Sequence, residues 1–76
     1  MNSSTDILIH LDHAPDGTAC QSLLTALRET SGVTRVHLDP ARPHLVVIAY
    51  EPGKTSSKNL LDIVLGQGHR AQLVGL

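Results

Sequence analysis

The stretch DILIHLDHAPDGTACQSLLTALRETSGVTRVHLD, residues 6–39, contains two strand patterns separated by a helix pattern. Residues 6–12 alternate apolar side chains with others, which is typical of a strand that has one face in the core. Residues 33–39 form a second strand segment, which is stopped by Pro40 and Pro43. The stretch therefore predicts a strand–helix–strand unit.

Residues 16–32, between these strands, have the period of an amphipathic helix. Asp16-Gly17 marks its start and Gly32 its end. The spacing i, i+3, i+4, i+7 places four side chains on one apolar stripe: Cys20, Leu23, Leu24 and Leu27.

The second half of the chain adds a strand, a helix and a closing strand. LVVIAYE, residues 45–51, is rich in β-branched residues, and Pro52-Gly53 then turns the chain. Ser56 is a candidate N-cap for the second helix, and residues 69–76 form the last strand. The apolar stripe of this helix consists of Leu60, Ile63 and Val64.

The predicted order β-α-β-β-α-β is that of a ferredoxin-like α+β sandwich, one four-stranded antiparallel sheet with two helices on one face. Residues 1–76 then form a single domain, in which residues 1–5 are expected to be a flexible N-terminus. This topology brings three loops to one edge of the sheet, at residues 12–17, 39–44 and 66–69.

Composition excludes several classes of protein. The net charge is −1, six Lys and Arg residues are scattered along the chain, and Tyr50 is the single aromatic residue, so a nucleic-acid surface is not expected. No apolar run reaches the roughly 20 residues of a membrane span. The N-terminus MNSSTD shows no export signal, and the lone cysteine fits a reducing compartment, which together predict a cytoplasmic protein.

Three segments resemble heavy-metal-associated (HMA) domains, the copper-chaperone-like modules that also stand at the front of metal-pumping ATPases. They are ALRETSGVTRVHLD (26–39), YEPGKTSSKNLLDIV (50–64) and GHRAQLV (68–74). The resemblance extends from Ile7 onward. It implies metal-ion binding or trafficking, with Zn(II) or Cu(I) as the ion and a metal transporter as a partner.

The chain departs from the HMA pattern at the loop that defines the family's activity. Members carry Gly-Met-x-Cys-x-x-Cys between the first strand and the first helix. When this motif is aligned without a gap, its two cysteines fall on Asp16 and Ala19. Cys20 falls one position later, where the family has an apolar core residue, in agreement with its place on the helix stripe.

A one-residue shift in this loop would bring Cys20 to the position of the second cysteine. His69 falls where family members carry an aromatic residue or a lysine beside the metal loop. The resemblance then implies a mixed nitrogen, oxygen and sulfur ligand set, better suited to Zn(II) than to Cu(I). This candidate metal set is His13, Asp16, Cys20 and His69.

Each candidate ligand also has a structural interpretation, in which no metal is bound. Cys20 would pack as a small apolar residue of the core. His13 and His44 would be ordinary loop residues, and His69 would cap the second helix. His10 and His37 are expected on the sheet face away from the helices, in contact with solvent.

That sheet face is also unusually apolar. Leu45, Val47 and Ala49 alternate along the third strand, and Leu8 is expected beside them on the first. An uncovered apolar face indicates a partner or a homodimer. The alternative function is therefore a protein-interaction or dimerisation module whose metal site has been lost. Leu61 and Leu65 are a second apolar candidate.

An enzyme is not expected. The topology is shared with acylphosphatases, but no glycine-rich loop with an arginine follows the first strand. The sequence also shows no Ser-His-Asp or Cys-His-Asn set.

Overall fold

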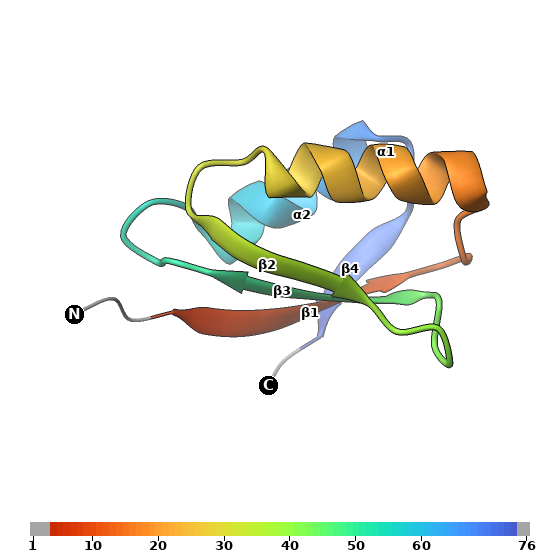
Figure 1. The fold of residues 1–76 in the computed structure, drawn as a ribbon, viewed down its shortest axis with the longest axis horizontal. Helices are drawn as coiled ribbons and strands as arrows, with labels where there is room; N and C mark the ends of the chain where they lie inside the picture. The colour runs from red at the N-terminus through yellow and green to blue at the C-terminus, as the bar shows by residue number, and fades with distance from the viewer. Residues whose placement is uncertain (1–3, 75–76) are drawn as a thin grey trace.

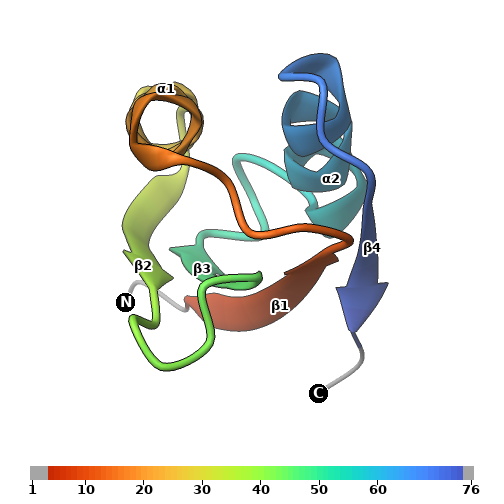
Figure 2. The same cartoon turned by 90° about the vertical axis from the view of Figure 1, so that its right-hand side faces the viewer.

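The computed structural model describes residues 4–74 and contains the six predicted elements in the predicted order. Figure 1 shows both helices above a twisted sheet, and Figure 2 shows them side by side, with no second layer of residues 4–74 on the other side of the sheet. The ferredoxin-like sandwich is thereby confirmed. The elements are β1 (Thr5–Leu11), α1 (Gly17–Arg28), β2 (Val33–Leu38), β3 (Leu45–Tyr50), α2 (Ser57–Gly66) and β4 (Ala71–Val74).

The sheet has the strand order β2-β3-β1-β4, and every neighbouring pair is antiparallel. β1 and β3 are therefore central, and each is paired on both sides. Ile9 lies opposite Val46, and Ile7 lies opposite Ile48. Because side chains alternate between the faces of a strand, this register sends one apolar set from each central strand towards the helices.

The hydrophobic core lies between the sheet and the helices. Each helix contributes a pair of buried side chains, Leu23 and Leu27 from α1 and Leu60 and Val64 from α2. On the sheet side the buried residues are Ile9, Leu11, Val36, Val46, Ile48 and Tyr50. The predicted helix stripes are thus the packing faces, with Leu24 and Ile63 partly buried beside them.

Both helices begin at a side-chain cap. Asp16 Oδ1 accepts a hydrogen bond from the Ala19 N–H at 2.8 Å, and Ser56 Oγ accepts one from the Asn59 N–H at 3.1 Å. Each bond satisfies a backbone donor that the first turn of a helix leaves free. Within residues 4–74, no helix is long and apolar enough to cross a membrane.

Three predicted boundaries need correction. α1 ends at Arg28 rather than at Gly32, because the Glu29 and Thr30 N–H groups close the last turn and Gly32 has a φ of +96°. Thr5, expected in a flexible N-terminus, is the first residue of β1 and lies opposite Tyr50. β4 begins at Ala71 rather than at His69. Residues 1–3 and 75–76 lie outside the described part of the chain.

Candidate functional site

Three loops meet at one edge of the sheet, as the topology predicts. They connect β1 to α1, β2 to β3 and α2 to β4, and we call their meeting place the loop edge. Backbone hydrogen bonds join them, from the Leu11 N–H to the His44 carbonyl at 2.7 Å and from the Asp12 N–H to the Arg70 carbonyl at 2.9 Å. Figure 2 looks directly at this edge.

His13 and His69 come together at the loop edge. Both line a hollow of about 400 Å³ between the β1–α1 loop and the α2–β4 loop. His13 is exposed and His69 is half-buried. His69 does not cap α2, because the C-cap residue of that helix is Gln67. The hollow is lined by Asp12, His13, Ala14, Pro15, Gly68, His69 and Arg70.

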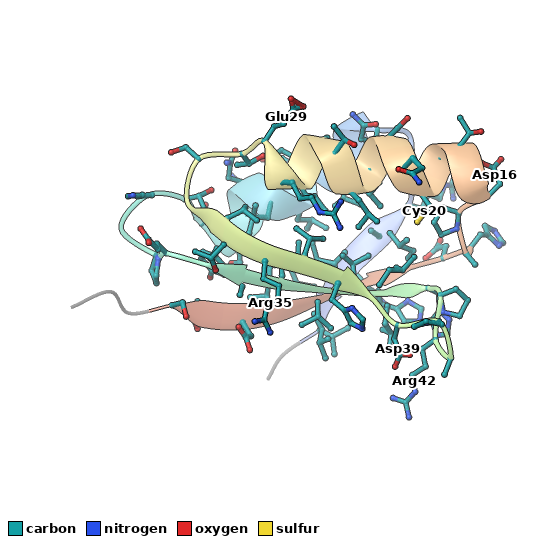
Figure 3. The ribbon with its side chains drawn as sticks, viewed as in Figure 1. Asp16, Cys20, Glu29, Arg35, Asp39 and Arg42 are labelled. Atoms are coloured by element: carbon teal, nitrogen blue, oxygen red, sulfur yellow. The ribbon has the colours of Figure 1, made fainter. Side chains whose placement is uncertain are left out.

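Asp16 and Cys20 are not in the lining of that hollow. Figure 3 shows the Asp16 carboxylate at the start of α1 and the Cys20 sulfur beneath the helix, on the side that faces the sheet. Cys20 is a free, half-buried thiol. Across residues 4–74, no three side chains of His, Cys, Asp or Glu are grouped so that they could hold one metal ion. The four-residue ligand set therefore stays a prediction.

The sheet face away from the helices, here called the open face, carries the predicted apolar residues. Leu8 lies opposite Val47, and Ala49 lies opposite Asp6. Leu8, Leu45, Val47 and Ala49 are each half-buried. Val74, which is 37% exposed, extends the apolar row beside Leu8.

Charged and polar side chains border this apolar row. Arg35 and His37 of β2 lie opposite Ala49 and Val47, and a hollow of about 510 Å³ opens beside them.

The second predicted apolar surface, Leu61 and Leu65 of α2, is only partly present. Leu65 is 44% exposed, whereas Leu61 packs against the core.

Two histidines form a contact that the sequence does not predict. The rings of His10 and His44 have their centroids 5.0 Å apart, with 74° between their planes. His10 is not the solvent-facing residue expected. It is half-buried, and its Nδ1 atom is covered without a hydrogen-bond partner. His44 is half-buried as well, because the chain enters β3 directly beside the end of β1.

No protein-family model and no curated protein matches the sequence. Solved structures do share its fold. Oxidized MerP from Ralstonia metallidurans CH34 has a TM-score of 0.83 at 14% identity and covers 96% of this chain and 100% of its own. A putative copper-ion-binding protein from Bacillus anthracis has a TM-score of 0.83 at 17% identity, with 95% and 100% coverage.

A third similar structure is the N-terminal domain of a potential copper-translocating P-type ATPase from Bacillus subtilis, in its Cu(I)-loaded state. Its TM-score is 0.84 at 18% identity, and the alignment covers 96% of this chain and 90% of that domain. At such identities the comparisons establish that this chain has the ferredoxin-like fold of these proteins. The site itself must be argued from the residues present here.

Proposed function

We propose that this protein is a binding module, not an enzyme, and that it binds or carries a metal ion at the loop edge. The observation that supports the proposal most directly is the hollow shared by His13 and His69. The two imidazoles come from different loops, His13 from the β1–α1 loop and His69 from the α2–β4 loop. Imidazole is a common ligand of transition-metal ions.

The full ligand set of the proposal is His13, Asp16, Cys20 and His69, and the ion is Zn(II) or Cu(I). Asp16 can contribute without giving up its cap, because Oδ1 accepts from Ala19 while the second carboxylate oxygen stays available. Cys20 lies in the first turn of α1, close to the same loop. The loop and the exposed His13 side chain would move to close the set around an ion.

The likeness to domains that carry copper suggests what the ion is for. The similar structures include a domain of a potential copper-translocating ATPase and a putative copper-ion-binding protein. We therefore propose a cytoplasmic setting and a metal transporter as the partner, to which this module would pass its ion or from which it would receive one.

Residue-resolved NMR tests the metal proposal. Reduced protein is titrated with Zn(II), and separately with Cu(I) without oxygen. We expect the signals of His13, Asp16, Cys20 and His69 to saturate together with one apparent Kd. Cys20→Ser should raise that Kd by about tenfold or more, since even changes next to metal ligands lower the metal affinity by this factor.

The matched control for this titration is His37→Ala, which removes an exposed histidine from the open face and should leave the Kd unchanged. If the loop-edge signals do not saturate, or if Cys20→Ser and His37→Ala behave alike, this ligand set is wrong.

A second candidate function is supported by the open face. There Leu8, Leu45, Val47 and Ala49 form a half-buried apolar row, which no second layer covers within the described chain. In this case the protein would act as an interaction or dimerisation module. Sedimentation velocity over a range of concentrations should then show a dimer that Val47→Lys abolishes and Leu65→Lys does not. A monomer at all concentrations would exclude the homodimer.

A further inference from the structure

His10 and His44 form a second pair of imidazoles, separate from those of the loop-edge hollow. His10 lies on the open face, opposite Leu45 of β3 and Gln72 of β4. His44 immediately precedes β3, and its ring contacts that of His10 edge to face. Neither residue belongs to the ligand set proposed above.

The backbone fixes the positions of both residues. His10 sits in a central strand that is paired on both sides. His44 is anchored through its carbonyl, which accepts the hydrogen bond from the Leu11 N–H at 2.7 Å. The backbone thus sets where the two side chains begin, and in the structure their rings are in contact.

The separation of the rings suits a shared metal ion. A tetrahedral ion with Zn–N bonds of about 2.1 Å places the centroids of two imidazole ligands about 5 Å apart. The centroids of His10 and His44 are 5.0 Å apart. The present interplanar angle of 74° requires one ring to turn so that both nitrogens face one point. The outer torsion of histidine has a broad range that permits this turn.

His10 also carries a buried polar atom without a hydrogen-bond partner. Its Nδ1 atom is covered and makes no hydrogen bond. A polar atom buried in this way costs about 1–3 kcal/mol. Its neighbours on the sheet, Leu45 and Gln72, do not supply the missing bond. Once the ring turns and uncovers this nitrogen, a metal ion would satisfy it.

We propose that His10 and His44 form a two-histidine site for a divalent transition-metal ion, such as Zn(II), on the open face. Borderline ions of this kind prefer imidazole nitrogen. Two protein ligands leave the remaining coordination positions to water or to a donor group from an incoming molecule. His44 ends the β2–β3 loop, but neither His10 nor His44 lines the loop-edge hollow, so the site does not require metal to bind in that hollow.

The test is a Zn(II) titration of the triple variant His13→Ala, Cys20→Ser, His69→Ala, which lacks three of the four loop-edge ligands. Long-range nitrogen–proton NMR correlations report each imidazole nitrogen separately. The titration is done at a pH of about 7.5, where free imidazole is largely unprotonated. We expect the ring signals of His10 and His44 to shift together and saturate, while those of His37 do not.

The decisive variant is His44→Phe in the same background, because phenylalanine keeps an aromatic ring against His10 but offers no nitrogen. It should weaken the apparent affinity at His10 by about tenfold or more, while His37→Ala leaves it unchanged. Should His44→Phe fail to fold, His10→Gln serves the same purpose, read at His44. The proposal is overturned if the His10 and His44 signals do not saturate, or if their response survives the loss of the partner imidazole. The pair would then be a packing contact alone.

Discussion

Asp16 has a structural role that must be separated from its proposed role as a metal ligand. Its Oδ1 accepts the Ala19 N–H and thereby starts α1. In the gap-free HMA alignment it occupies the position of the first cysteine. Loss of metal binding on mutation of Asp16 could therefore arise from a frayed helix, and the two roles need different substitutions.

Asp16→Ala should lower the free energy of unfolding by about 1 kcal/mol, because alanine cannot cap the helix. Asp16→Asn should lower it much less, since asparagine caps about as well as aspartate. Urea unfolding followed by circular dichroism measures both.

In the NMR titration, Asp16→Asn should still weaken the proposed binding of Zn(II) at the loop edge, because an amide oxygen carries no charge. An asparagine variant as unstable as the alanine variant would show that the cap is not what Asp16 contributes to stability.

The turn that follows α1 is constrained by a segment far away in the chain. The Gly32 carbonyl accepts a hydrogen bond from the Glu51 N–H at 2.7 Å, which ties the start of β2 to the end of β3. A Cβ atom on Gly32 would lie 2.8 Å from the Lys54 Cβ and 3.1 Å from the Thr55 Cγ2. The glycine is needed both for its φ of +96° and for this close approach.

Gly32→Ala should therefore destabilise the protein by about 2 kcal/mol or more, from backbone strain and the clash together. The matched control is Gly68→Ala. Gly68 has a φ of +91°, but its added Cβ would meet nothing within 4 Å. Backbone strain alone should cost about 1–2 kcal/mol there. Equal losses of unfolding free energy in thermal or urea denaturation would mean that the contact with Lys54 and Thr55 carries no weight.

At the scale of the whole molecule, a single layer of buried side chains joins the helices to the sheet. Leu60 and Val64 of α2 are fully buried against the sheet, and so are Leu23 and Leu27 of α1. A chain of 76 residues has a small core, so each of these side chains contributes a large share of a total stability of only a few kcal/mol.

Leu60→Ala should cost about 2–5 kcal/mol, from lost burial and the cavity that remains. Leu65→Ala, on the same helix but 44% exposed, should change the stability by about 0.5 kcal/mol or less. Equilibrium urea unfolding of both variants checks the difference. Similar losses would mean that α2 does not pack through the face described.

The sequence determined the order of the elements and most of the core. Ile9, Leu23, Leu27 and Leu60 are all buried where the periods of two and 3.6 residues place them. The sequence predicts Ser56 as a cap and Asp16-Gly17 as the start of α1, and both Ser56 and Asp16 accept a backbone N–H three positions later. The missing cysteine pair is also plain from the sequence, since the chain has a single cysteine.

The end of α1 is less predictable, because a glycine after an apolar stripe, here Gly32, is typical of a helix stop. It belongs instead to the turn before β2, where the approach of Lys54 and Thr55 requires a glycine. That approach joins segments far apart in the chain, which no local pattern records.

Tertiary structure alone decided which side chains meet. His10 and His44 are 34 positions apart in the chain, and only the pairing of β1 with β3 brings their rings within 5.0 Å. In the same way, the meeting of two loops puts His13 and His69 in one hollow, while the cap of α1 holds Asp16 outside it. Periodicity assigns a residue to a face, but strand register and loop path set the distances on which a binding site depends.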